Sequence, residues 1–77
     1  MNPALSIVIP VFNEEAILET AIRALIQKIE HLRRPFEIVI AENGSVDETL
    51  RIAETIALES SMVRVIRAPE ANYGRAL

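Results

Sequence analysis

The sequence has no cysteine and a single histidine, and both scarcities narrow the chemistry that it can support. Without cysteine, a disulfide framework and a thiolate metal site are excluded, and the composition fits a reducing compartment. No apolar run approaches the roughly 18 residues that a membrane-spanning helix needs, and the N-terminus lacks the layout of a secretory signal. We therefore expect this stretch of chain to be cytoplasmic.

Basic side chains are in the minority, because 8 Lys and Arg stand against 11 Asp and Glu and leave a net charge of −3. A negative balance argues against nucleic acid as a partner. The charges are unevenly distributed along the chain. Within residues 61–77, Arg64, Arg67 and Arg75 are accompanied only by Glu70, and we expect that end of the chain to lie near an anion.

Glycine is also scarce, with 2 among 77 residues, whereas 51% of the residues are hydrophobic and 25% are charged. This composition is typical of a folded chain rather than a disordered one. A chain of this size buries about 60–65% of the surface that it exposes when unfolded, so its core is small. No repeat, linker or domain boundary is visible, and we interpret residues 1–77 as a single partial domain.

Three short runs of branched apolar residues predict β-strands at residues 4–10, 36–41 and 62–66. The first run is almost continuously apolar and ends at Pro10, which is typical of a strand that is buried on both faces. Strands of that kind belong to parallel sheets. The spacing of the runs leaves room for one helix between each pair.

Helical periodicity fills the first gap. Apolar residues recur there at steps of three and four, which predicts an amphipathic helix with this buried stripe: Leu18, Ile22, Leu25, Ile29 and Leu32. Asn13 is a suitable N-cap, and Glu14 and Glu15 would then lie in the first turn, where negative charge suits the helix dipole. Capping and ligand binding are alternative readings of Asn13 and Glu14, and the two roles can coexist.

A second helix is predicted between the second and third strands. Residues 45–48, Ser-Val-Asp-Glu, form a capping-box sequence, and we predict that the helix begins at Val46. Its apolar face would contain Val46, Leu50, Ala53 and Ala57. A turn signal at residues 72–74 indicates a third helix that begins near Arg75.

The predicted order is strand, helix, strand, helix, strand, which defines an α/β fold with a three-stranded parallel sheet and right-handed helical crossovers. Ligands of such sheets bind beyond the carboxyl ends of the strands, so the loops at residues 10–14, 41–47 and 68–75 are candidate binding segments. The chain has neither a dinucleotide fingerprint nor a P-loop. A nucleotide would therefore need side chains such as Asn43 and Glu14 for its base and ribose.

Three segments resemble motifs of the family 2 glycosyltransferases with the GT-A fold, and together they extend over nearly the whole chain. They are Ser6-Ile-Val-Ile-Pro-Val-Phe-Asn-Glu-Glu15, Glu37-Ile-Val-Ile-Ala-Glu-Asn-Gly-Ser-Val-Asp-Glu-Thr49 and Asn72-Tyr-Gly-Arg-Ala76. The subgroup that they resemble most contains the polyprenyl-phosphate sugar transferases of the dolichyl-phosphate mannose synthase type. The resemblance implies a Rossmann-like, N-terminal half of a nucleotide-sugar-binding domain.

The resemblance also implies a set of nucleotide-binding residues: Pro10, Phe12, Asn13, Glu14, Ala41, Asn43 and Arg75. By match to the family motifs, Phe12 would lie beside the base, and Glu14 would accept hydrogen bonds from the ribose. The chain reads Glu42-Asn43 where two aspartates are common. Because asparagine offers a donor as well as an acceptor, this departure leaves the identity of the base open.

The reaction that the resemblance implies is transfer of a sugar, with inversion, from a nucleotide-diphosphate donor to a polyprenyl-phosphate or saccharide acceptor. Family members hold Mg²⁺ or Mn²⁺ on the diphosphate through an Asp-x-Asp motif. The chain has a single aspartate, Asp47, so we expect the metal ligands and the catalytic base to lie outside residues 1–77. We therefore expect no catalytic residue here, an inactive fragment, and a longer parent enzyme that can associate with the cytoplasmic face of a membrane.

A different class of function stays open. A small core and a third strand with an unpaired outer edge would also suit a non-catalytic α/β binding or assembly module that forms homo-oligomers through that edge. A dinucleotide-dependent oxidoreductase is disfavoured because the glycine fingerprint is missing.

Overall fold

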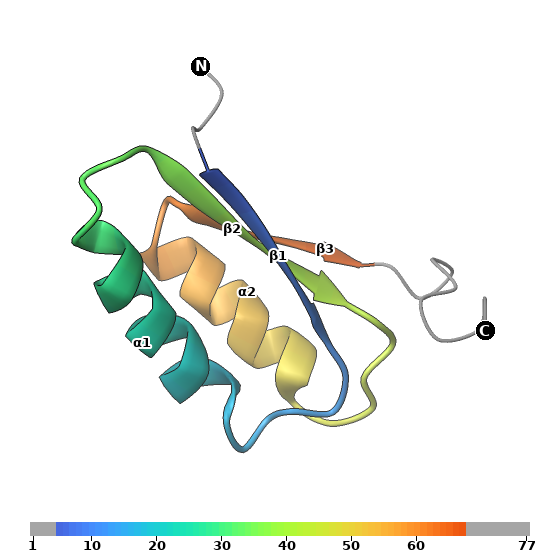
Figure 1. Ribbon diagram of the computed structural model, residues 1–77. Helices are drawn as coiled ribbons and strands as arrows, with labels where there is room; N and C mark the ends of the chain where they lie inside the picture. The colour runs from blue at the N-terminus through green and yellow to red at the C-terminus, as the bar shows by residue number, and fades with distance from the viewer. Residues whose placement is uncertain (1–4, 68–77) are drawn as a thin grey trace.

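The computed structural model describes residues 5–67, which form five elements in the predicted order. They are β1 (Leu5–Val11), α1 (Leu18–Glu30), β2 (Phe36–Glu42), α2 (Thr49–Glu59) and β3 (Val63–Arg67) (Figure 1). The α/β fold is confirmed, and each strand lies within one residue of its predicted bounds. Among these residues, no helix has the length and apolar character needed to cross a membrane. The third loop, the predicted third helix and Arg75 lie outside the described residues.

The three strands form one parallel sheet in the order β1-β2-β3. Ile9 pairs with Ile40, and Ile40 pairs with Val65, so the carboxyl ends of the strands lie along one edge. Both crossovers step across the sheet in the same direction, and right-handed connections of that kind place their helices on the same face. Figure 1 shows α1 and α2 together on one side of the sheet. Within residues 5–67, the opposite face carries no helix, and we call it the helix-free face.

The core lies between the two helices and the sheet. Ile38 and Ile40 of the central strand are 0% exposed. Ile22 of α1 and Ile56 of α2 belong to the same apolar cluster and are 1% exposed each. The central strand therefore contributes the most deeply buried side chains, as expected for a strand with a neighbour on each side.

Strand β1 is not buried on both faces, and that prediction is wrong. Its residues alternate between half-buried and exposed up to Val11, and Val8 is 57% exposed on the helix-free face. The reason is that both helices cover the same side of the sheet. In the central strand, Val39 and Ala41 are nevertheless 4% and 0% exposed, because β1 and β3 flank them.

A row of polar side chains crosses the helix-free face. The Ser6 hydroxyl donates to one Glu37 carboxylate oxygen at 2.8 Å, and Arg64 Nε donates to the other at 3.2 Å. These hydrogen bonds, from Ser6 first and Arg64 second, lower the pKa of Glu37 below its ordinary value. Arg64 and Arg67 also place positive charge on β3, and charged side chains on an edge strand disfavour pairing with another chain. Assembly through this edge stays a prediction.

Both helices begin later than their sequence signals indicate, and the predicted caps are wrong. Helix α1 begins at Leu18 rather than directly after Asn13, and no side chain caps it. Helix α2 begins at Thr49 rather than at Val46, and the hydrogen bonds of a capping box are not formed at residues 45–48. The physical reason is that the side chains of Asn13 and Ser45 bond to the opposite loop instead of to their own helix, whereas Asp47 accepts the Thr49 N–H at the start of α2.

The apolar stripe predicted for α1 is confirmed at Leu18, Ile22, Leu25 and Ile29, whereas one predicted position of each helix is exposed. Leu32 lies beyond the end of α1 and is 52% exposed, and Val46 precedes α2 and is 87% exposed. The buried positions of α2 are Thr49, Ala53 and Ile56. The face that α2 turns to the core is therefore shifted from the predicted one.

Candidate functional site

The chain segments that follow β1 and β2 meet at the carboxyl edge of the sheet (Figure 1). The Asn43 N–H donates to the Val11 carbonyl oxygen at 3.0 Å, which extends the pairing of the two strands by one step. Beyond this point the chain continues through residues 12–17 after β1 and residues 43–48 after β2. We call these segments the first loop and the second loop.

Asn13 and Ser45 join the two loops through reciprocal hydrogen bonds. The Asn13 N–H donates to Ser45 Oγ at 2.8 Å, and the Val46 N–H donates to Asn13 Oδ1 at 2.9 Å. Asn13 has a φ of 52°, in the left-handed region that asparagine tolerates better than most residues. Asn13 therefore fixes the distance between the loops.

A second group of contacts lies next to this pair. The Glu14 N–H donates to Thr49 Oγ1 at 2.7 Å, and the Thr49 hydroxyl donates to Asp47 Oδ1 at 2.5 Å. The Glu15 N–H donates to Asp47 Oδ2 at 3.3 Å, and the Glu48 N–H donates to a Glu15 carboxylate oxygen at 2.9 Å. Desolvation acts to raise the pKa of Asp47, but the hydrogen bonds from Thr49 and Glu15 outweigh it and hold this pKa below its ordinary value. The two loops are thus held as one unit.

Glu42 is the last residue of β2, and 1% of its surface is exposed. Its side chain holds the start of the second loop. Its carboxylate accepts a hydrogen bond from the Gly44 N–H at 3.0 Å and another from the Ser45 N–H at 2.7 Å. Burial acts to raise the pKa of Glu42, but the hydrogen bonds from Ser45 and Gly44 and the charge of Arg67 outweigh burial and lower it. Gly44 has a φ of 78°, a conformation in which glycine carries no Cβ penalty.

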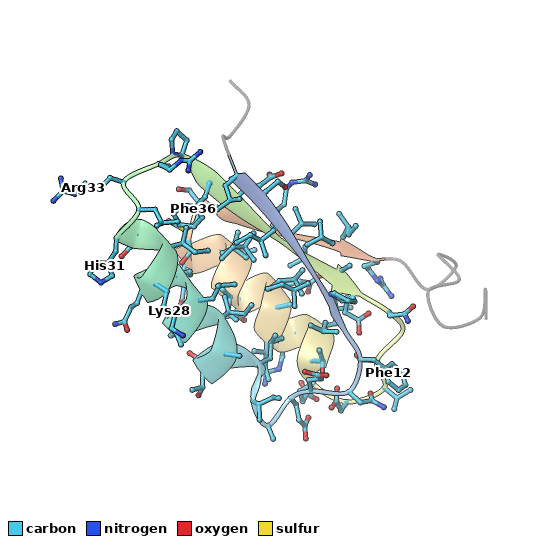
Figure 2. All side chains as sticks on the ribbon, in the orientation of Figure 1. Phe12, Lys28, His31, Arg33 and Phe36 are labelled. Carbon is cyan, nitrogen blue, oxygen red and sulfur yellow. The ribbon has the colours of Figure 1, made fainter. Side chains whose placement is uncertain are left out.

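The predicted nucleotide-binding residues of the first two motifs lie along this edge. Pro10 and Ala41 are register partners on the helix-free face, where Pro10 is exposed and Ala41 is buried. The side chain of Phe12 extends from the first loop (Figure 2) and is 53% exposed, so it is not part of the core. Asn43 is half-buried at the start of the second loop.

Glu14 lies on the side of the sheet that the helices cover. It is half-buried and helps to line a groove of about 350 Å³ between β1 and α1, together with apolar residues such as Val11 and Leu18. Among the hydrogen bonds within residues 5–67, those of Glu14 involve its backbone alone. The structure thus brings Pro10, Phe12, Asn13, Glu14, Ala41 and Asn43 to one edge, from both faces of the sheet.

The described part of the site is acidic. Five carboxylates lie in or beside the two loops: Glu14, Glu15, Glu42, Asp47 and Glu48. Carboxylates accept hydrogen bonds from hydroxyl and amide groups, such as those of a ribose or a base, but they repel the like charge of a diphosphate. Within residues 5–67, no group of three His, Asp or Glu side chains is placed to hold a metal ion. The carboxylates of this arrangement therefore suit hydroxyl or amide groups of a ligand better than anionic groups.

The sequence patterns predict no loop-organising role for three residues that hold the loops together: Glu42, Asp47 and Thr49. Asp47 and Thr49 look like ordinary residues near a helix start, and Thr49 bonds to a residue 35 positions away. Glu42 does carry a local signal, because a carboxylate two residues before a glycine can accept the N–H groups of the turn that follows.

In open α/β sheets, the carboxyl edge where two such loops meet is the usual place for a small-molecule site. Residues 6–77 match the family described as Glycosyl transferase family 2. The chain belongs to this family, which confirms the resemblance of its three sequence motifs.

Individual relatives agree with this membership. The chain is 34% identical over 61 residues to Glycosyltransferase AglD of Haloferax volcanii, a match that covers 77% of this chain and 10% of that protein. It is 37% identical over 70 residues to an undecaprenyl-phosphate 4-deoxy-4-formamido-L-arabinose transferase of Pseudomonas savastanoi, and 39% identical over 72 residues to that of Pseudomonas fluorescens. Each of these two matches covers 91% of this chain and 21% of the relative. The chain therefore spans between a tenth and about a fifth of the length of these relatives.

Proposed function

We propose that residues 1–77 are the nucleoside-recognising part of a longer glycosyltransferase. The donor would be a nucleotide-diphosphate sugar, and the acceptor would be a polyprenyl phosphate or a saccharide. The observation that carries this proposal is the edge formed by the two joined loops, from which Phe12 extends with 53% of its surface exposed. The family and the printed names of the relatives, one of which includes undecaprenyl phosphate, support the classes of donor and acceptor.

Each predicted residue has a role that its place in the fold allows. The exposed ring of Phe12 offers a face on which a base can stack, a contact worth about 1–3 kcal/mol. Asn43 offers both a donor and an acceptor to the edge of the base. The Glu14 carboxylate would accept hydrogen bonds from the ribose hydroxyls. The exposed Pro10 would form an apolar surface beside the nucleoside, and its buried register partner Ala41 would support that surface.

The reaction in the parent enzyme would be a single displacement. An acceptor oxygen forms a bond to the anomeric carbon while the bond from that carbon to the nucleotide oxygen breaks, and the electron pair leaves with the nucleotide. Stabilisation of the charge on this leaving group would be the largest contribution to catalysis. From this chain, Arg75 is the proposed basic group near the nucleotide.

A divalent cation, Mg²⁺ or Mn²⁺, would supply further stabilisation of the leaving group in the parent. The residues described here do not fit such a cation, because no group of three His, Asp or Glu side chains among residues 5–67 is placed to bind it. We propose that its ligands and the base that activates the acceptor belong to other parts of the parent. We further propose that the fragment binds nucleotide without transferring sugar.

Replacing Glu14 with alanine should weaken binding of a nucleoside diphosphate about tenfold or more. Hydrogen bonds to a charged group contribute about 1.5–3 kcal/mol, and loss of the carboxylate removes those from the ribose. Isothermal titration calorimetry with UDP and with GDP measures the change. Glu30→Ala, at the last residue of α1, is the control and should bind as the unmodified chain does. Equal affinity of the two variants would contradict the role of Glu14, and no binding by the unmodified chain would contradict the proposed function.

A further inference from the structure

We infer that Thr49 is a positioning residue of the nucleoside site, which acts by fixing the backbone of Glu14. This inference rests on the proposed function, because it concerns how the chain directs the Glu14 side chain toward a ligand. Thr49 lies in α2 and does not itself reach the exposed edge, since it is 0% exposed. Its effect on a ligand would therefore pass through the first loop.

The hydroxyl of Thr49 has two partners, and their chemistry fixes its direction. A carboxylate oxygen can only accept, so the O–H of Thr49 donates to Asp47 Oδ1 at 2.5 Å. The lone pairs of Thr49 Oγ1 are then free to accept the Glu14 N–H at 2.7 Å. Asp47 Oδ1 also accepts the Thr49 N–H at 2.9 Å, which holds the carboxylate in place. Hydrogen bonds in series of this kind strengthen one another.

The carbonyl group of Glu14 is held as well as its N–H group. Its carbonyl oxygen accepts hydrogen bonds from the Ile17 N–H at 3.1 Å and the Leu18 N–H at 3.0 Å, which tie it to the start of α1. With its N–H bound to Thr49 and its C=O bound to α1, the backbone of Glu14 has little freedom. The direction in which its side chain leaves the backbone is set by these contacts, and Thr49 supplies the N–H contact from α2.

The alternative is that Thr49 is only a buried residue that fills space. Valine has nearly the same shape as threonine and keeps the burial, but it has no hydroxyl. Serine keeps the hydroxyl and loses a methyl group. A positioning role therefore predicts that serine restores function and valine does not, whereas a packing role predicts the reverse order.

The test compares Thr49→Val and Thr49→Ser with Thr55→Val, a control on α2 whose exposed hydroxyl bonds to the Arg51 carbonyl oxygen. Two quantities are measured: the affinity for UDP and GDP by calorimetry, and the exchange rate of the Glu14 amide hydrogen by NMR. Thr49→Val should weaken binding at least fivefold and speed exchange at Glu14 at least tenfold. Thr49→Ser and the control should stay within twofold of the unmodified chain in both quantities.

The inference is overturned if Thr49→Val leaves Glu14 exchange and nucleotide affinity unchanged, or if Thr49→Ser is as impaired as Thr49→Val. Should Thr49→Val not fold, Thr49→Ala tests the same contact, because it also removes the hydroxyl that accepts the Glu14 N–H and places less apolar surface beside the Asp47 carboxylate. Unchanged exchange at Glu14 in Thr49→Ala would then overturn the inference. If the unmodified chain binds neither nucleotide, the proposed function fails, and the exchange rate still decides whether Thr49 fixes Glu14.

Discussion

Replacing Ile40 with alanine is expected to lower the free energy of unfolding by about 2–5 kcal/mol. Ile40 is 0% exposed in the central strand, with a strand on each side and the helical layer against it, so the cavity has little freedom to collapse. Domains of ordinary size are stable by about 5–15 kcal/mol, and a chain with so small a core belongs at the low end. The variant should therefore be largely unfolded under mild conditions. Urea titration followed by far-UV circular dichroism measures the loss.

The matched control is Val8→Ala, a truncation on the helix-free face of the neighbouring strand. Val8 is 57% exposed and lies outside the apolar cluster, so its truncation should change stability by no more than about 0.5 kcal/mol. A loss for Val8→Ala as large as that for Ile40→Ala would show that the helix-free face is covered in solution, which would contradict the layer arrangement given above.

Replacing Glu42 with glutamine should cost about 1.5–3 kcal/mol at pH 7, the range for hydrogen bonds to a charged group. The Glu42 carboxylate accepts one N–H from Gly44 and one from Ser45. An amide has a single acceptor oxygen, so at least one of these N–H groups would face an NH₂ group instead. The second loop would then lose the conformation that presents Asn43 and Ser45.

The effect of Glu42 should also depend on pH, with a sign that follows from its lowered pKa. A carboxyl group whose pKa is lower in the folded state than in the unfolded state stabilises the fold fully above its ordinary pKa, here 4.5, and loses this contribution as the pH falls through its folded pKa. The difference in unfolding free energy between the unmodified chain and Glu42→Gln should therefore be constant near neutrality and shrink on acidification. Urea titrations at several pH values provide the measurement. A difference that stays the same down to pH 3, or an equal loss in the exposed control Glu54→Gln, would refute the role of Glu42.

The strands could be predicted from the sequence almost to the residue, whereas the helix starts could not. Strand signals are local, because a short run of branched apolar residues, such as the one around Ile38, by itself indicates a buried strand. A capping signal is also local, but the side chain that carries it can find a better partner elsewhere. Asn13 and Ser45 have that choice, and they bond across 32 residues. The burial of β1 was mispredicted for a related reason, since the sequence does not show on which face both helices pack.

The candidate site was predictable to the extent that residues match a motif. Phe12, Glu14 and Asn43 follow from the resemblance, and the structure adds that they lie on one edge. The roles of Asp47 and Thr49 depend on which loops become neighbours, and only the register of β1 with β2 decides that.

We propose that a nucleoside binds at the edge where the first and second loops meet, and an NMR titration locates the bound nucleoside. Amide spectra of the ¹⁵N-labelled chain are recorded while UDP, and separately GDP, is added. At least one of the two nucleotides should shift the amide signals of residues 12–14 and 43–46, while residues 28–34 at the far end of α1 stay unchanged. Shifts confined to residues 28–34, or no shift at millimolar nucleotide in a folded sample, would rule out binding at this edge.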